Sequence, residues 1–256
     1  EANYLVPIDL NVDVQEKDGK RTVKWEPSFR FIDTASITPD PDTQKRVDAF
    51  KAELDKELNV VIGKTEGPLD SRRNVVRTQE AAIGNLIADA MREAVGAEIA
   101  ITNGGGIRAD KEYAAGSDIT RKDVLTELPF GNVTVLTEVT GQQVWDALEN
   151  GFSMIEDGAG RFPQVSGMKV VADKAKPAGS RVVSVEINGK PLDPKATYTL
   201  ATNDYMLTGG DGYTSFAGGK VLVDARGGKL IANDVMVLVK KRGTVASKVE
   251  GRIVFK

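Results

Sequence analysis

Two glycine-rich loops carry the side chains of this sequence that are best suited to hold a ligand. Each follows an apolar run, and their sequences are Asn103-Gly104-Gly105-Gly106-Ile107-Arg108 and Thr208-Gly209-Gly210-Asp211-Gly212-Tyr213. Glycine lets backbone amides approach a ligand closely, and the amide, guanidinium and carboxylate groups in these loops add hydrogen-bonding capacity. One Gly-Gly pair alone is more often only a tight turn. Two such loops together favour a binding site for a small polar ligand.

The first loop also fits the loose dinucleotide-binding pattern G-x-G-x-x-A, with Gly104, Gly106 and Ala109 at the three fixed positions. This pattern would make the protein a dinucleotide-dependent oxidoreductase, provided that a helix begins at the loop. Residues 110–116 do not have a helical pattern, so the match is weak. The sequence contains no G-x-x-x-x-G-K-[ST] phosphate-binding loop.

Composition narrows the chemistry further, because the 256 residues include no histidine and no cysteine. Ser-His-Asp triads, Cys-His pairs and zinc sites built on histidine or thiolate are therefore excluded. The net charge of -3 comes from interspersed acidic and basic residues, which gives no basic stripe for a nucleic acid or an anionic membrane. No apolar run approaches the ~20 residues that span a bilayer. These features favour a small-molecule ligand.

The sequence patterns around the two loops predict a mixed α/β (α+β) architecture. Helical spacing predicts helices near residues 80–95 and 141–155, and Asn233 is expected to cap a last helix that runs to residue 239. Extended patterns predict strands over residues 99–103, after residue 132, and over 165–171, 181–187, 198–202 and 252–255. Three of these strands follow one another without helices between them, so we expect a mixed sheet rather than a parallel one.

The N-terminal residues have a different pattern. Residues 8–25 alternate between apolar and polar side chains around an Asp18-Gly19 turn, which predicts a β-hairpin. Because an isolated hairpin is marginally stable in water, we expect it to be the end of a preceding domain. Asp40 and Pro41 then predict the start of a helix that carries apolar residues up to Leu58.

Five motifs, in order, resemble the C-terminal domain of the 5'-nucleotidase family. They are RTQEAAIGNL at 77–86, NGGGIR at 103–108, LPFGN at 128–132, FPQVSG at 162–167 and GGDGY at 209–213. The resemblance covers nearly the whole chain. It implies that residues 1–38 are the end of a metallophosphatase domain, that 39–62 form an interdomain helix, and that 63–256 form the nucleotide-binding domain. The family in question includes UDP-sugar hydrolases and 2',3'-cyclic-nucleotide phosphodiesterases.

The resemblance also assigns roles to individual residues. Phe130 and Tyr205 match two aromatic residues that hold the base between them, although a phenylalanine is more often a core residue. The hydroxyl of Tyr205 is expected to reach water or the ligand. Asp211 matches a carboxylate that accepts hydrogen bonds from ribose hydroxyls. The other residues that the resemblance places at the nucleotide are Asn103, Gly105, Asn132, Gly160, Arg73, Arg77 and Arg108.

Among these, the amides of Asn103 and Asn132 lie near the ribose and base in the family, and Gly160 matches a backbone contact to the base. Arg77 and Arg108, with Arg73 as a third, match arginines that engage the nucleotide and its phosphate, where guanidinium forks pair with oxygen atoms.

In the family, hydrolysis uses water activated by two divalent metal ions, whose ligands include histidines. The resemblance therefore implies that this chain holds no metal or other cofactor and is inactive alone, that the two ions belong to a separate N-terminal domain, and that the protein is periplasmic or extracellular. The alternative is a free-standing nucleotide- or nucleoside-binding module without catalysis.

Overall fold

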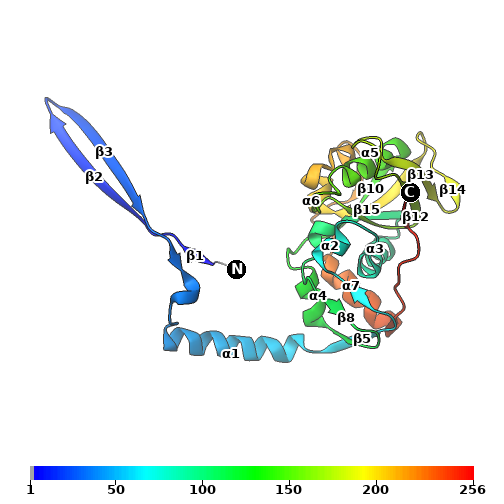
Figure 1. Cartoon of the computed structure of the whole chain (residues 1–256), viewed down its shortest axis with the longest axis horizontal. Coiled ribbons are helices and arrows are strands. Elements are labelled where there is room, and N and C mark those ends of the chain that lie inside the picture. The colour runs from blue at the N-terminus through cyan, green and yellow to red at the C-terminus, as the bar shows by residue number, and fades with distance from the viewer. Residues whose placement is uncertain (1–2) are drawn as a thin grey trace. The chain divides into compact units, whose positions relative to one another are not determined.

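A computed structural model describes residues 3–256, and the chain divides into two compact units, one that ends at Asp55 and one from Lys56 to Lys256. Figure 1 labels their elements. The first unit contains the paired strands β1 (Tyr4–Leu5) and β4 (Ile32–Asp33), the paired strands β2 (Ile8–Lys17) and β3 (Lys20–Phe29), and most of helix α1 (Pro41–Leu58).

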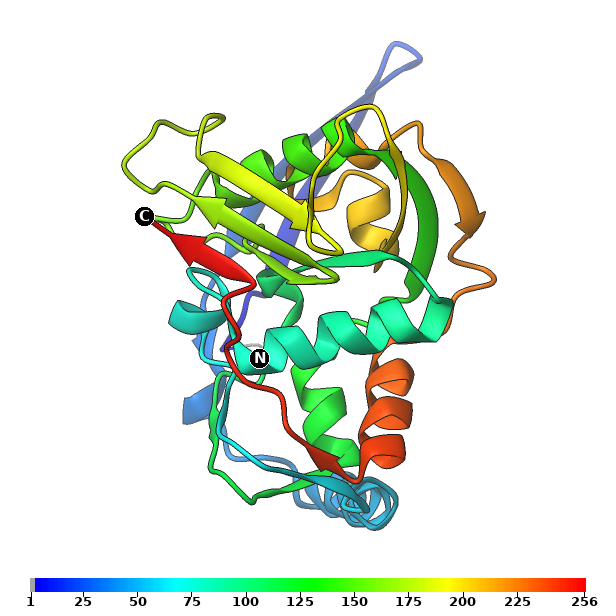
Figure 2. The same ribbon diagram turned by 90° about the vertical axis from the view of Figure 1, so that its right-hand side faces the viewer.

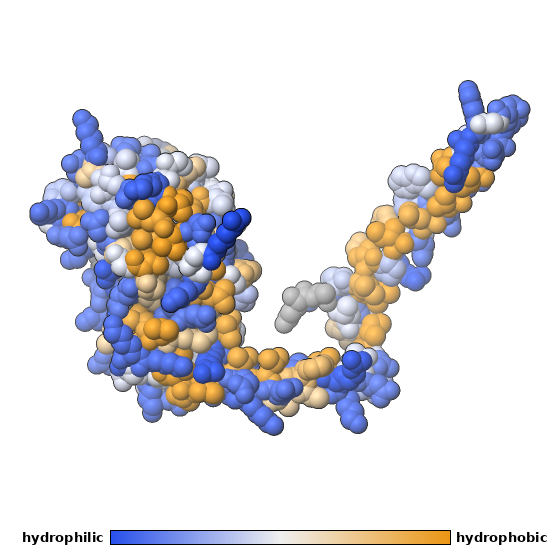
Figure 3. Space-filling model, turned by 180° about the vertical axis from the view of Figure 1, so that it is seen from behind, coloured by the Kyte–Doolittle hydropathy of each residue, from blue (hydrophilic) through white to orange (hydrophobic). Residues whose placement is uncertain are grey.

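The predicted N-terminal hairpin is confirmed as β2 and β3. Its turn falls at Asp18 and Gly19, which both have positive φ, as the tightest hairpin turns require. Every residue of both strands is exposed, including the apolar ones. Figure 3 shows apolar side chains as an orange stripe along the hairpin, and the exposed apolar residues of its strands include Val12, Val14 and Val23.

The predicted cap of α1 is also confirmed, because the backbone N–H of Thr43 donates a hydrogen bond of 2.8 Å to Oδ1 of Asp40. None of the residues of α1 is buried. The helix therefore owes its stability in this chain to capping and local propensity rather than to packing.

The second unit is built on a five-stranded sheet with the strand order β11-β7-β15-β10-β16. Strands β7 and β15 pair in parallel and the other neighbours pair antiparallel, which confirms the predicted mixed sheet. The strands are β7 (Ile99–Asn103), β10 (Thr134–Thr140), β11 (Pro163–Ser166), β15 (Thr197–Asn203) and β16 (Lys220–Val223).

Hydrophobic cores cover both faces of this sheet, because successive side chains of a strand point to opposite faces. Ala100 of β7 packs with helix α3 (Ala82–Val95) and helix α7 (Ile231–Arg242) in one core. Ile99 and Ile101 pack with helix α5 (Gly141–Phe152) in the other. Figure 2 shows α3 running along one side of the sheet, with α5 on the other side.

Smaller sheets and helices complete this unit. A four-stranded sheet has the order β14-β13-β12-β18, a three-stranded sheet has the order β17-β5-β9, and β6 pairs with β8. Their bounds are β5 (Val61–Thr65), β6 (Leu69–Asp70), β8 (Glu112–Tyr113), β9 (Asp118–Thr120), β12 (Met168–Ala172), β13 (Val182–Ile187), β14 (Lys190–Pro191), β17 (Thr244–Val245) and β18 (Ile253–Phe255), and the short helices are α2 (Arg73–Val76), α4 (Arg121–Glu127) and α6 (Asp204–Leu207).

Two details of the sequence interpretation need correction. Helix α7 begins at Ile231, so Asn233 lies inside the helix and does not cap it. Helix α4 was not predicted at all, although Thr120 and Asp123 form a capping box at its start. It is only seven residues long, too short for apolar periodicity to reveal it.

The residue before strand β18, Arg252, forms an ion pair with Asp89 of α3. The two nitrogens of the guanidinium lie 2.6 and 3.0 Å from the two carboxylate oxygens, and the hydroxyl of Ser166 donates a further bond of 2.6 Å to Asp89. Burial opposes ionisation of Asp89, but the hydrogen bonds from Arg252 and Ser166 outweigh it and lower the pKa of Asp89. This pair therefore stabilises the fold while Asp89 is ionised.

Candidate functional site

Four segments of the second unit converge at one edge of the five-stranded sheet. The parallel strands β7 and β15 both end there, at Asn103 and Asn203. Strands β11 and β10 run the opposite way and begin there, because Pro163 pairs with Asn103 and Thr134 pairs with Asn203. Topology thus brings together loops that lie up to a hundred residues apart in the sequence, which is the position where open α/β sheets commonly bind ligands.

A pocket of about 440 Å3 opens among these loops, within the usual size range of ligand sites. Nine of the ten residues predicted to contact a nucleotide line it, together with Gly106. The nine are Arg77, Asn103, Gly105, Arg108, Phe130, Asn132, Gly160, Tyr205 and Asp211. The tenth, Arg73, is not among the residues that line the pocket.

The two aromatic residues lie at the surface of the pocket and not in a core. Phe130 is 60% exposed and Tyr205 is 45% exposed. Large apolar rings that remain this exposed in one concave site are available to a ligand. The guanidinium carbon of Arg108 lies 5.4 Å from the centroid of the Phe130 ring, so a positive charge accompanies this ring.

One face of the Tyr205 ring is covered by the backbone of Gly210. A methyl group on Gly210 would lie 2.5–2.6 Å from Cζ, Cδ1 and Cδ2 of Tyr205, which are spread around the ring. The ring must therefore lie flat on Gly210, and only its other face is open. Gly209 and Gly212 have φ of 92° and 82°, a conformation that glycine adopts without strain. Glycine is therefore required at 209 and 212 for the backbone conformation and at 210 for the close contact with the ring.

Asp211 is held by its neighbours on both carboxylate oxygens. The side-chain N–H of Asn103 donates to Oδ2 over 2.7 Å, and the hydroxyl of Tyr205 donates to Oδ1 over 3.0 Å. Asn103 is held in turn by Asn203, whose side-chain N–H donates to it over 3.0 Å. Asn203 also caps α6 through Met206, which places Tyr205. Sequence reasoning missed this role of Asn203, although its place at a strand end resembles that of Asn103.

The glycines of the first loop are required by close backbone packing. The N–H of Gly105 donates to the carbonyl of Gly160 over 2.8 Å, and a methyl group on Gly105 would lie 2.8 Å from Cα of Gly160. The amide of Gly105 is therefore bonded within the protein rather than offered to the pocket. Asn132 is fixed similarly, since its side-chain N–H donates to Asp204 over 2.9 Å.

Positive charge gathers at the end of the pocket where Arg77 and Arg108 lie. Arg77 is only 8% exposed, and its Nε has no hydrogen-bond partner among the residues that the structure describes. Burial, followed by repulsion from Arg73 and Arg108, lowers the pKa of Arg77. Arg73 thus acts on this end of the pocket through its charge, while its backbone N–H donates to Asp110 over 2.7 Å.

Gln164 of β11 holds the segment that carries Arg77. Its side-chain N–H groups donate to the carbonyls of Val76 and Gln79, and its carbonyl accepts from the N–H of Ala81 at the start of α3. Gln164 is fully buried. The sequence marked this residue only as part of the FPQVSG motif, and its positioning role appears from contacts with residues more than 80 positions away.

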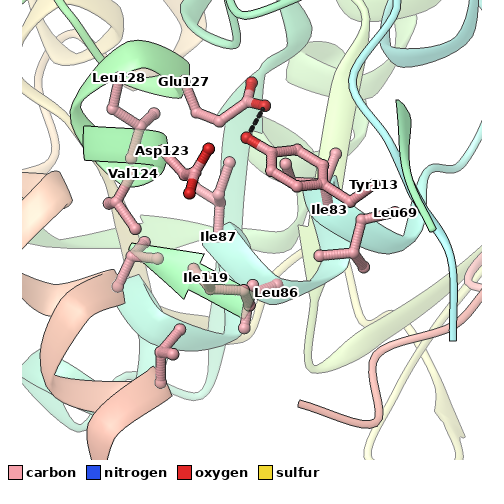
Figure 4. Close-up of a pocket in the computed structure, with 12 residues that line it drawn as sticks. Leu69, Ile83, Leu86, Ile87, Tyr113, Ile119, Asp123, Val124, Glu127 and Leu128 are labelled. Carbon is pink, nitrogen blue, oxygen red and sulfur yellow. Dashed lines mark hydrogen bonds between the residues drawn. The ribbon is translucent and has the colours of Figure 1, made fainter. Parts of the chain in front are cut away.

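A second buried group supports Arg108. Figure 4 shows the Tyr113 hydroxyl directed at Glu127 within an apolar surround that includes Ile83 and Val124. This bond is 2.8 Å long. The Glu127 carboxylate also accepts a hydrogen bond from the backbone N–H of Ala109, and the Glu127 backbone carbonyl accepts one from the backbone N–H of Arg108. Burial raises the pKa of Glu127, although bonds from Tyr113 and Ala109 favour its ionised form. The cavity beside it, about 20 Å3, has room for about one water molecule.

Two further kinds of site were considered for these residues, a metal site and a dinucleotide site. Within residues 3–256, no three acidic side chains come together in a group that could hold a metal ion. The segment after Gly106 is extended and does not open a helix, so the dinucleotide pattern lacks the structure it needs. Among residues 3–256, no helix has the length and apolar character that crossing a membrane requires.

Comparison with known proteins agrees with the motifs. The family model described as "5'-nucleotidase, C-terminal domain" matches residues 61–218. The trifunctional nucleotide phosphoesterase protein YfkN of Bacillus subtilis is 41% identical over 98% of this chain and 17% of its own length. Protein UshA of Escherichia coli is 35% identical over 83% of this chain and 36% of its own length.

Among solved structures, the 5'-nucleotidase precursor from Thermus thermophilus matches with a TM-score of 0.76 and 33% identity. The match covers 99% of this chain and 50% of that one. The chain thus spans half or less of the length of these relatives. The motifs, the family model and the shared fold lead to one conclusion: this chain belongs to the family of 5'-nucleotidase C-terminal domains.

Proposed function

We propose that this chain binds the base, ribose and phosphate of a nucleotide, which a separate dimetal domain of the full-length protein then hydrolyses. The observation that supports this most strongly is the pocket itself. The residues expected to bind the base, the ribose and the phosphate come from five separate segments of the sequence, and they line one cavity of suitable size.

The base would lie between Phe130 and the open face of Tyr205. Stacking on aromatic rings is worth about 1–3 kcal/mol per base and accepts any base, because every base has a π face. Asn132 and the backbone near Gly160 border the same cavity and offer hydrogen-bonding groups to the edge of the base. Asp211 would accept hydrogen bonds from the ribose hydroxyls, as an ionised carboxylate with two oxygens is suited to do.

The phosphate would lie against Arg77 and Arg108. A buried cation is costly unless an anion or hydrogen-bond acceptors compensate it. Arg77 forms no ion pair with any described residue and leaves Nε unbonded. A phosphate dianion would supply both the missing charge and the missing acceptor. This end of the pocket therefore favours a nucleotide over a nucleoside.

Hydrolysis would take place on the separate domain. The chain has no histidine or cysteine, and its described acidic residues form no group suited to a metal ion, so no step of the hydrolysis is assigned to it. We propose that the two divalent ions are bound by an N-terminal metallophosphatase domain, with residues 1–38 as its end, 39–62 as the interdomain helix and 63–256 as the nucleotide-binding domain. A periplasmic or extracellular location is part of the same proposal, and cell fractionation would test it.

Calorimetric titration of the chain with AMP, adenosine, UMP and UDP-glucose tests the proposal. We expect binding of at least one of these ligands, with AMP bound more tightly than adenosine and its advantage reduced at high salt, because exposed parts of the phosphate site are screened. Failure of all four ligands to bind would refute the proposal.

A further inference from the structure

The hydroxyl of Tyr205 is used within the protein. It donates to Oδ1 of Asp211 over 3.0 Å and accepts from the backbone N–H of the same residue over 3.1 Å. Tyr205 and Asp211 are thereby joined at two points. The ring that lines the pocket and the carboxylate beside it form one unit.

Asp211 needs such support because its backbone has φ of 52° and ψ of 21°, in the left-handed region that L-residues seldom adopt. Gly209 and Gly212, on either side of this position, also have positive φ. A loop with two such glycines has many alternative backbone conformations when no side chain holds it. The bonds from Tyr205 and Asn103 select one of them.

These two bonds also determine what Asp211 can still accept. An ionised carboxylate has about four acceptor positions, two on each oxygen. Tyr205 uses one position on Oδ1 and Asn103 uses one on Oδ2. One position remains on each oxygen, which suits a ligand with two neighbouring hydroxyl groups.

We propose that Tyr205, besides offering its ring, is a positioning residue that fixes Asp211 as a two-pronged acceptor and so makes the site selective for a vicinal diol, as in ribose, over deoxyribose. The inference rests on the proposed nucleotide site. It assigns the hydroxyl of Tyr205 to sugar selection, whereas the ring serves the base.

The test compares Tyr205→Phe with the parent chain, because phenylalanine keeps the ring and its contact with Gly210 and removes only the hydroxyl. Both proteins are titrated with adenosine and with 2',3'-dideoxyadenosine. In the parent, adenosine should bind more tightly. In the variant, this preference should fall about three- to tenfold, the effect of one net hydrogen bond, while dideoxyadenosine binds as before.

Tyr198→Phe is the matched control, because the hydroxyl of Tyr198 also accepts a backbone N–H bond, of 3.1 Å from Asp193, but Tyr198 does not line the pocket. It should leave the preference unchanged. Equal weakening of both nucleosides by Tyr205→Phe would overturn the inference, since the hydroxyl would then act on the base or on the fold. No change with either nucleoside would overturn it as well.

A measurement without ligand separates this inference from the proposed function. Amide hydrogen exchange at Asp211 should be faster in Tyr205→Phe, because its N–H loses the oxygen that it donates to. Unchanged exchange would refute the positioning role even if nucleosides bind. If exchange is faster but the parent binds no nucleoside, the two residues are coupled but the proposed function, and sugar selection with it, is wrong.

Discussion

Replacing Gly210 with alanine should disturb the proposed base site without disturbing the core. The new methyl group would lie 2.5 Å from Cζ of Tyr205. Carbon atoms in contact are about 3.5–4.0 Å apart, so the ring must move by about 1 Å or more. Since the proposed base position lies between Tyr205 and Phe130, a ring displaced into this space narrows it. The 3.0 Å bond from Tyr205 to Asp211 would be strained by the same movement.

We expect Gly210→Ala to weaken binding of the preferred nucleoside by about 1–3 kcal/mol, or about 5- to 150-fold, which is the range for one lost stacking face. Calorimetry measures the loss, and thermal unfolding checks that the fold persists. Gly67→Ala is the control, because a methyl group there meets nothing within 4 Å. The change should also be non-additive with Phe130→Ala, since both act on one stacked base. Undiminished affinity in a folded Gly210→Ala protein would show that the Tyr205 ring is not a base platform.

Three further predictions concern the other parts of the molecule. Phe130→Ala should lower nucleoside affinity about 5- to 150-fold, whereas Phe50→Ala, which removes a ring that is 62% exposed on α1, should have no effect in the same titration. Arg77→Met should reduce the preference for AMP over adenosine by about 10- to 150-fold, and Arg108 should account for what remains. The variant should keep the unfolding temperature of the parent, because it removes a buried cation that has no ion-pair partner among the described residues. The free energy of unfolding should fall as pH drops below about 4, because the pKa of Asp89 is lowered in the folded state and the unfolded chain therefore takes up more protons. Asp89→Asn should make this dependence shallower in chemical denaturation, while Asp9→Asn, in an exposed pair with Arg30, should not.

The sequence predicted those parts of the fold that depend on long local patterns. Helices α3 and α5 and strands β7 and β15 were placed correctly, because their apolar residues recur with a clear period. The start of α7 was misplaced, since Asn233 is a good capping residue by type, but tertiary packing of Ile231 and Ala232 extends the helix past it.

The candidate site was predictable in its members but not in its internal contacts. Resemblance to a family identified nine of the residues that line the pocket, but it also included Arg73, which does not line it, and left out Gly106. Nothing in the sequence indicates that Asn203 holds Asn103, or that Gln164 holds the segment of Arg77, because these bonds join residues about 80–100 positions apart. Likewise, a glycine at position 210 is visible in the sequence, but the aromatic ring that lies on it is not.

The exposure of Phe130 and Tyr205 bears on how such a site changes during evolution. Most substitutions are constrained by the stability they cost, and this cost is largest in a packed core. The two rings lie on loops and remain 60% and 45% exposed, while both hydrophobic cores of this unit are built by other residues. Substitution of Phe130 should therefore cost little in folding, whereas Tyr205 is also bonded to Asp211 through its hydroxyl. Gln164 and Asn203 are buried and each holds another segment of the pocket, so substitutions there cost more stability, and sequence variation in this pocket should be concentrated at Phe130.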